Sequence, residues 1–437
     1  MSRSHRSAAG IGFLGIVAGL LGATGAWAQA PEPVVTLDEA VEAALRHSPQ
    51  VVQAIGAVRN AESAERNAWG AFLPNLSLSS GASLSSTERF NPQTNTSVTG
   101  SSDSYSAGVS SQLQIFTGGR RGAELDGARA QTLAANAALV EQRYALILTT
   151  KRAFFDVLRT DDLIRVAEAR VQRAQEGLDA ATHREQVGTG TRSDVLRARL
   201  EVTNARQSLL QARNQRRTAA FALGRLVGVD GAVGARLDAP LDPTPLELDS
   251  DELLELVLEN APAVRAAVAA ARSADASVRA ARSQYFPSVT ASGGYDLFNQ
   301  EPTLSGSRKS WSLRLGISYP LFNRFQREDA ISRASVQADI ARARSEDARR
   351  QARAELERVL GALDLARQQI ELAEEAVLAA EEDLRVQQER YRLGVSTILD
   401  QVTSQMNLVQ AAIDLIAARY DYQIARAELE ALVGREL

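Results

Sequence analysis

The side chains best placed for chemistry lie in two short turns, VGTGTRSD at 187–194 and LGVSTILD at 393–400. Each turn contains a glycine that can end a helix in a left-handed conformation, and each closes on an aspartate, Asp194 or Asp400. A carboxylate at that place can accept backbone N–H bonds from the returning helix and meet the positive end of its dipole. The spacing therefore predicts a capped helix start in both turns.

Other reactive groups are scarce. The chain has no cysteine and three histidines, so it offers no thiolate metal site, no disulfide framework and close to no chance of a histidine triad. The many acidic residues are spaced three or four positions from arginine, as in EDARRQARAELERV, which solvated ion pairs on helix faces explain. We expect no enzyme, no cofactor and no metal site.

Residues 1–28 are typical of a secretory signal peptide. Arg3 and Arg6 precede an apolar run, and Ala26-Trp27-Ala28 forms a small-x-small cleavage site. An uncleaved membrane anchor is the alternative, although the run is short and rich in glycine. Without cysteine at the cleavage site, lipid anchoring is not expected. Loss of the two arginines takes the formal charge from −4 to −6, which does not suggest nucleic-acid binding.

The chain consists of two copies of one unit. Pro49 and Pro262 differ by 213 positions, whereas Gly188 and Gly394, and likewise the two turn aspartates, differ by 206. Between the copies, LDAPLDPTPLELD contains three prolines and cannot be helical. The expected boundaries are repeat 1 at 29–228, a linker at 229–248 and repeat 2 at 249–437.

Each repeat contains a proline-free tract with a heptad pattern, typical of long packed helices. In repeat 2, large residues recur every seven positions from Leu356 to Tyr391, with smaller residues three positions after the first four. Large and small seam positions allow helices to approach closely. We expect helices over 119–187 and 324–393, each about 100 Å long at 1.5 Å per residue. A solvent-exposed filamentous coiled coil fits the heptads equally well.

Four segments instead have a period of two: 76–85, 105–115, 289–297 and 311–319. One side of each is apolar and the other small and hydroxylated, and the lengths suit a tilted crossing of a bilayer. We predict transmembrane strands in hairpins 75–117 and 287–322; a soluble hairpin capping a helical bundle is the alternative. Four strands cannot close a barrel, so several chains must share one. Two chains would give a filled eight-stranded barrel, and three would leave a passage.

These features together resemble the TolC-like outer-membrane efflux proteins. The resemblance covers 36–434 and rests on the doubled helix–strand–strand–helix–helix unit, on TLDEAVEAALRHSP, and on the paired turns VGTGTRSDVLRA and LGVSTILDQVTS. It implies a mainly α fold with a membrane β-barrel part: a homotrimer that shares a 12-stranded barrel in the outer membrane of a Gram-negative bacterium and a 12-helix tunnel across the periplasm.

The resemblance also implies partners and a mechanism. A periplasmic adaptor, an inner-membrane transporter of RND, ABC or MFS type and outer-membrane lipid would surround a passive conduit for efflux or type I secretion. The alternative is a periplasmic structural or adaptor coiled coil without a pore. The exported substrate and the class of pump stay open.

By the same resemblance, both turns lie at the periplasmic tip. Asp400 matches part of an acidic ring, and Tyr391 matches a tyrosine that holds the tip closed, although core packing also explains Tyr391. Ser396 and Thr403 stand where the family often has an arginine and an acidic residue, so Arg192 is a candidate substitute for the arginine. The expected gate residues are Asp400, Tyr391, Asp194, Arg192 and Thr403. The expected adaptor-docking residues are Val187, Gly188, Thr189, Gly190, Leu393, Gly394, Val395 and Ser396.

Overall fold

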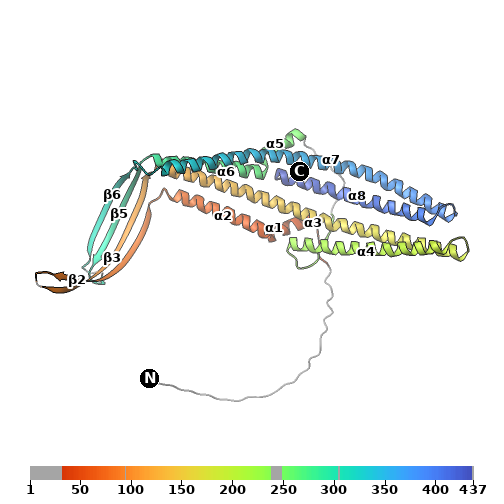
Figure 1. Ribbon diagram of the computed structural model, residues 1–437, viewed down its shortest axis with the longest axis horizontal. Coiled ribbons are helices and arrows are strands. Elements are labelled where there is room, and N and C mark those ends of the chain that lie inside the picture. The colour runs from red at the N-terminus through yellow and green to blue at the C-terminus, as the bar shows by residue number, and fades with distance from the viewer. Residues whose placement is uncertain (1–31, 94, 238–248, 304–305, 436–437) are drawn as a thin grey trace, which may run out of the picture.

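The computed structural model describes residues 32–93, 95–237, 249–303 and 306–435. The expected signal peptide and residues 238–248 of the expected linker lie outside these ranges. The described chain is an elongated body with one β-sheet at one end and helices along the rest of its length (Figure 1). Within the described residues, no helix is both long enough and apolar enough to cross a membrane.

Two shorter helices open each half. The first half has α1 (Leu37–His47) and α2 (Pro49–Gly70), and the second has α5 (Ser250–Asn260) and α6 (Pro262–Arg282), which a 3₁₀ turn (Ser283–Tyr285) follows. Thr36 starts α1 with a capping box to Glu39, and Ser48 caps α2. Proline follows directly at the first position of α2 and α6, where its missing N–H costs nothing.

A long helix and a returning helix make up the remainder of each half. They are α3 (Arg120–Gln186) and α4 (Arg192–Val227), then α7 (Gln326–Arg392) and α8 (Ile398–Val433). Both long helices have 67 residues and both returning helices have 36. The long helices begin and end within two residues of the sequence expectation. At 1.5 Å per residue, each long helix spans about 100 Å.

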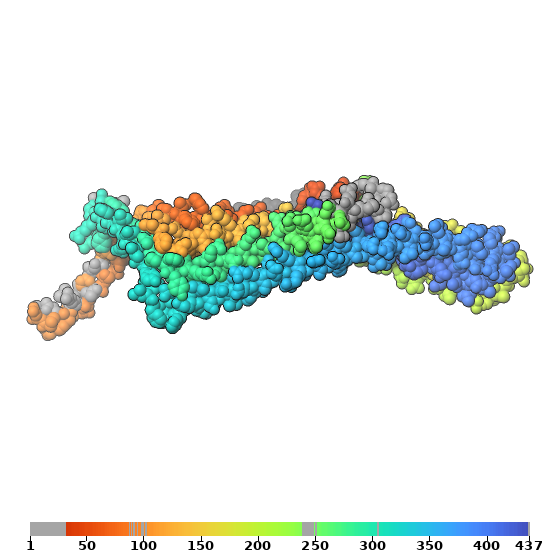
Figure 2. Space-filling view, turned by 90° about the horizontal axis from the view of Figure 1, so that it is seen from above, coloured from red at the N-terminus to blue at the C-terminus, as the bar shows by residue number. Residues whose placement is uncertain are grey.

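The helices pack side by side along α3 and α7. Near the sheet, α3 contacts α2 and α6, and farther along it contacts α4 and α8; α7 contacts α6 and then α8. Many buried α3 residues are alanines spaced by seven, namely Ala123, Ala130 and Ala137, then Ala167, Ala174 and Ala181. Such small residues let the axes approach closely. Figure 2 shows the blue α8 and the yellow-green α4 at the end opposite the sheet.

A cluster of large buried side chains lies halfway along the body. Phe154 and Val157 of α3 are fully buried against Leu223 of α4 and Tyr420 of α8. A short parallel pair, β1 (Val34–Val35) and β4 (Gly234–Ala235), lies beside them. The Tyr420 hydroxyl donates to Asp162 at 2.9 Å, and burial raises the pKa of Tyr420 to about 12. The three helices are therefore joined here by one shared core.

The sheet has four antiparallel strands in the order β2 (Asn75–Asn91), β3 (Thr96–Phe116), β5 (Ser288–Asn299) and β6 (Arg308–Ser318). Leu78, Val109, Tyr295 and Trp311 form one apolar row across it. β2 and β3 are longer than the expected 76–85 and 105–115, because they pair with each other past Tyr105, where the pairing of β3 with β5 stops. They form a two-stranded ribbon there.

Two arginines fix the joint between the sheet and the long helices. Arg121 donates to the carbonyls of Ala71 (3.1 Å) and Ile115 (3.0 Å), and its guanidinium carbon lies 4.8 Å from the ring centre of Phe72. Its counterpart in repeat 2 makes the same arrangement: Arg327 donates to Pro320 (3.2 Å) and Leu321 (3.4 Å) and lies 4.9 Å from the ring of Tyr285.

Candidate functional site at the helical tip

The two turns share one backbone conformation. In the first, Gly188 has φ of 76°, and the Thr189 N–H donates to the Arg184 carbonyl at 2.9 Å. In the second, Gly394 has the same φ, and the Val395 N–H donates to Arg390 at 2.9 Å. This six-to-one hydrogen bond with a left-handed glycine is the Schellman motif. Both long helices therefore stop at defined residues.

Both turn aspartates cap the returning helices. The Thr191 N–H donates to the Asp194 carboxylate at 3.1 Å, while the Asp194 N–H donates to the Thr191 hydroxyl at 3.2 Å. Thr397 and Asp400 repeat the pattern at 2.9 and 3.3 Å. The bond from the Thr397 N–H holds the pKa of Asp400 below its ordinary value. Capping is thus present in both repeats, and a gating role for either aspartate stays a prediction.

The remaining expected tip residues are mostly exposed. Val187, Leu393 and Val395 expose 58%, 78% and 66% of their surfaces, which leaves them available for contact. Thr403 is exposed and donates its hydroxyl to the Leu399 carbonyl of its own helix at 2.9 Å. Ser396 is half-buried and donates to the Gln387 carbonyl at 3.4 Å.

Arg192 forms an ion pair within its own repeat. Its side chain is 80% exposed, and its ion pair is with Glu185 of its own repeat at 3.7 Å. Its expected role as a substitute for the absent arginine stays a prediction. Arg192 is the first residue of α4.

Arg184, near the end of α3, connects the two repeats. Its guanidinium carbon lies 4.6 Å from the ring centre of Tyr391 on α7. The same guanidinium donates to the Tyr391 carbonyl and, at 3.2 Å, to the Thr189 carbonyl. It therefore binds both turns at once. Sequence reasoning missed it because repeat 2 has an arginine at the equivalent position, Arg390, and no pattern distinguishes the two.

Tyr391 is 5% exposed, and its hydroxyl has no hydrogen-bond partner among the described residues. Burial raises the pKa of its phenol, while the nearby Arg184 cation lowers it and the Asp194 carboxylate raises it. The structure therefore brings Tyr391 and Asp194 near one another without a hydrogen bond from the hydroxyl to that carboxylate. Tyr391 contributes a buried ring and a carbonyl to the tip.

Below the turns, a polar layer links three helices. Arg170 of α3 donates twice to Glu201 of α4, at 3.0 and 2.8 Å, and the two side chains are 17% and 9% exposed. Gln405 of α8 donates to the Arg170 carbonyl at 3.3 Å. A buried, doubly bonded pair is lost at high cost when one partner is removed. This layer ties the outer half of α8 to repeat 1.

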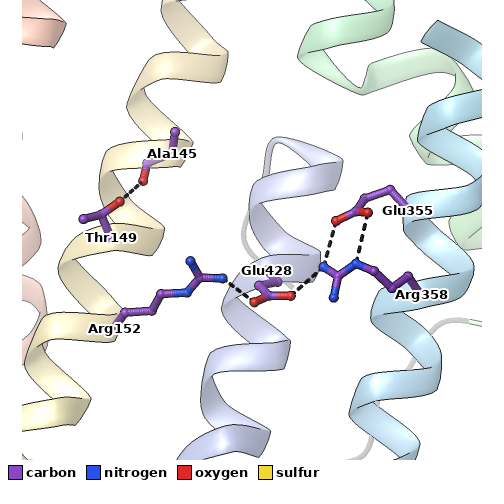
Figure 3. A network of polar contacts seen from close by, with 6 residues as sticks. All are labelled: Ala145, Thr149, Arg152, Glu355, Arg358 and Glu428. Atoms are coloured by element: carbon purple, nitrogen blue, oxygen red, sulfur yellow. Dashed lines mark hydrogen bonds and ion pairs between the residues drawn. The ribbon is translucent and has the colours of Figure 1, made fainter. Parts of the chain in front are cut away.

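Farther from the tip, Glu428 of α8 accepts from two long helices (Figure 3). Arg152 of α3 donates to one of its oxygens, and Arg358 of α7 donates to the other at 2.8 Å. Arg358 also donates to Glu355 at 2.7 and 3.0 Å. Its hydrogen bonds to Glu355 and, to a smaller extent, to Glu428 raise the pKa of Arg358. The nearby Glu430 accepts from Lys151 at 2.5 Å. This end of α8 is thereby fixed to both α3 and α7.

Comparison with known proteins identifies the family. The family model described as "Outer membrane efflux protein" matches residues 40–229 and 253–435, most of the chain. The chain belongs to this family. Its relatives include Protein CyaE of Bordetella pertussis, 29% identical over 329 residues, which are 71% of this chain and 67% of CyaE. The outer membrane is accordingly the location of this efflux protein.

Other relatives are matched over a smaller share of their length. The probable efflux pump outer membrane protein TtgC of Pseudomonas putida is 27% identical over 257 residues, 56% of this chain and 51% of TtgC. The cobalt-zinc-cadmium resistance protein CzcC of Cupriavidus metallidurans is 29% identical over 214 residues, 49% of this chain and 50% of CzcC. The efflux protein thus spans about half the length of these two relatives.

Solved structures share the fold. The outer membrane protein VceC of Vibrio cholerae has a TM-score of 0.79 and 21% identity, with 92% of this chain and 96% of VceC covered. The CmeC outer membrane channel of Campylobacter jejuni has a TM-score of 0.80 and 17% identity, with 91% and 85% covered. The efflux protein therefore has the fold of TolC-like channels.

Proposed function

We propose that this efflux protein is the outer-membrane channel of a tripartite efflux or type I secretion system and acts as a passive conduit. An inner-membrane transporter would supply the energy, and a periplasmic adaptor would open the tip. One observation carries the proposal: a sheet with an exposed apolar face lies at one end of helices about 100 Å long, and the two helical turns at 187–194 and 393–400 lie at the other end.

The exposed side chains of the sheet support a lipid contact. Leu76, Leu78, Trp311 and Leu313 are each at least 76% exposed and share one face through the strand register. Water would not favour such a patch, whereas lipid does. The sheet has two outer strands, β2 and β6, and open edges are not viable in a bilayer. Three chains would give a closed barrel of twelve strands.

The repeats at 29–228 and 249–437 support a tunnel with alternating halves. In a homotrimer, six long and six returning helices would enclose it, and the turns at 187–194 and 393–400 would surround its periplasmic mouth. Asp400, Asp194 and Thr403 would then line or border the mouth, and the exposed Val187, Leu393 and Val395 would meet the adaptor.

The names of the relatives refer to an efflux pump in one case and to cobalt-zinc-cadmium resistance in another. We therefore propose the conduit and its two partners without a cargo. RND, ABC and MFS transporters are all compatible with a tip made of two helical turns.

The proposal is tested by the mass of the detergent-extracted outer-membrane form and by its conductance in a planar bilayer. We expect a trimer and discrete channel currents. A monomer recovered from the periplasmic fraction, without currents, would replace the conduit with a periplasmic coiled-coil scaffold.

A further inference from the structure

We propose that Arg184 is the positioning residue that holds the tip closed, and that it acts on the ring and main-chain carbonyl of Tyr391 while the phenol hydroxyl plays no part. The inference rests on the proposed function for its meaning as a gate. Its geometry, however, belongs to one chain and can be tested by itself.

The first step is the position of Arg184 between the repeats. It leaves α3 in repeat 1, stacks at 4.6 Å on the ring of Tyr391 in repeat 2, and donates to the carbonyls of Tyr391 and Thr189. A planar guanidinium can stack and donate at the same time, which a lysine ammonium cannot do. Separation of the two turns would break the stack and the bond to Tyr391 together.

The second step is the state of the phenol. The Tyr391 hydroxyl is buried and has no partner among the described residues, so it gives the closed tip no hydrogen bond. An unpaired buried hydroxyl costs free energy. What a tyrosine provides at this position, and an aliphatic residue does not, is an aromatic face that attracts the Arg184 cation.

The third step is the recurrence of the arrangement. The three arginine–aromatic stacks found among the described residues are those of Arg121, Arg327 and Arg184, and each arginine also donates to two main-chain carbonyls. Two of them join a strand end to a long helix. The tip is thus held by the same combination of an arginine–aromatic stack and two main-chain hydrogen bonds that connects the sheet to the long helices.

The fourth step is the space that the first turn leaves for Arg184. A Cβ added at Gly190 would lie 2.9 Å from the Arg184 Cβ, so a side chain there would displace the base of the arginine. The equivalent residue of repeat 2 is Ser396, and the residue after Arg184 is Glu185 where repeat 2 has Tyr391. Repeat 1 therefore supplies the arginine and the room, and repeat 2 supplies the ring.

The test uses the absence of native cysteine, which allows spin labels at chosen sites only. Labels at Val187→Cys and Leu393→Cys, both exposed residues that end the long helices, report the separation of the two turns. Four variants are compared in this background: Arg184→Gln, Tyr391→Leu, Tyr391→Phe and, as the matched control, Arg392→Gln, whose side chain is 74% exposed and pairs with Glu389 of its own helix. Channel conductance is measured on the same variants without labels.

We expect Arg184→Gln and Tyr391→Leu to broaden the label distances and raise the fraction of open channels about tenfold, in keeping with a lost cation–π contact and a charge-assisted bond. Tyr391→Phe and Arg392→Gln should match the parent. Opening by Tyr391→Phe as large as that of Tyr391→Leu would assign the closure to the hydroxyl and overturn the proposal. An unchanged tip in Arg184→Gln would also overturn it.

The two measurements separate this inference from the proposed function. If the label distances change as expected but the protein carries no current, the conduit hypothesis is rejected and the role of Arg184 in holding the two turns together stands. If channel currents are normal but Arg184→Gln leaves the label distances unchanged, the role of Arg184 is rejected and the conduit hypothesis stands.

Discussion

The two ends of the long helices are fastened differently. At the sheet end, each repeat has its own stacked arginine, Arg121 on Phe72 and Arg327 on Tyr285, at equivalent positions. At the tip, one arginine from repeat 1 reaches an aromatic ring of repeat 2. The backbone of the two turns is nevertheless the same, down to the glycine φ of 76° and the capping boxes.

This difference between the sheet end and the tip distinguishes contacts that the fold requires in both repeats from a contact that occurs at the tip alone. Local backbone geometry is kept in both repeats wherever a helix must stop, turn and restart. The arginine–aromatic stack occurs once in each repeat where a strand meets a long helix, and once per chain where the two helical hairpins meet at the tip. A contact that exists once per chain can be released without disturbing the turns themselves.

The largest expected effect breaks the sheet end. Arg327 is 8% exposed and binds two carbonyls and a ring, so Arg327→Ala should lower the free energy of unfolding by about 3 kcal/mol. Thermal unfolding in detergent, followed by circular dichroism, measures this loss. Arg333→Ala is the control, because that side chain is 79% exposed and pairs only with Asp329 in the described structure. Equal melting of both variants would contradict the role of Arg327 at the joint.

The next effect concerns the first joint. Arg121 makes equivalent contacts but is only half-buried, so Arg121→Ala should cost about 1.5 kcal/mol, less than its counterpart in repeat 2. The same melting experiment compares the two. A loss larger than that of Arg327→Ala would mean that burial does not rank the joints.

A smaller effect compares the turns. Gly190→Ala should cost about 1 kcal/mol because its Cβ would press on Arg184, whereas Ser396→Ala removes one long hydrogen bond and should change stability by less than about 0.5 kcal/mol. Hydrogen exchange at the tip amides of 184–195 and 390–401 measures both. Similar protection losses in the two turns would show that the tip is symmetric after all.

The smallest effect concerns pH. The pKa of Asp400 is lowered by the bond from the Thr397 N–H, so the cap stabilises α8 fully above the ordinary aspartate pKa of 3.8 and is lost as pH falls through the lowered value. Asp400→Asn should therefore melt slightly earlier than the parent at pH 7, with a difference that shrinks on acidification below pH 3.8. A difference in melting temperature that does not depend on pH would show that the charge of the Asp400 carboxylate does not stabilise the cap.

Much of the architecture follows from local sequence rules. Heptad seams without proline predicted helices 119–187 and 324–393, and the structure has Arg120–Gln186 and Gln326–Arg392. Alternation located all four strands, because apolar side chains recur at every second position on one face of each. It underestimated β2 and β3, since the ribbon past Tyr105 is rich in serine and threonine and has no apolar period to mark it.

The tip was predictable in part. Glycine, threonine and aspartate at fixed spacing specify the turn and the cap, and these are contacts within a few residues of each other. Arg184 and Tyr391 are 207 positions apart, so their contact depends on how two hairpins pack. Arg192, beside the turn, was the candidate in sequence; its side chain is 80% exposed and pairs with Glu185 of its own repeat.

Different contacts hold the two ends of α8: the ion pairs of Glu428 hold one end, and the Gln405 bond to Arg170 holds the outer half. One end is tied to both long helices, and the other, at Ile398, lies 30 residues away, about 45 Å along the helix axis. If the contacts of its outer half with α3 and α7 were released, the helix would act as a lever arm with its fulcrum near Glu428. A tilt of about 10° there would carry the far end by about 8 Å, roughly the distance between neighbouring helix axes. A small tilt at the middle of the molecule would in this way become a large displacement at its tip.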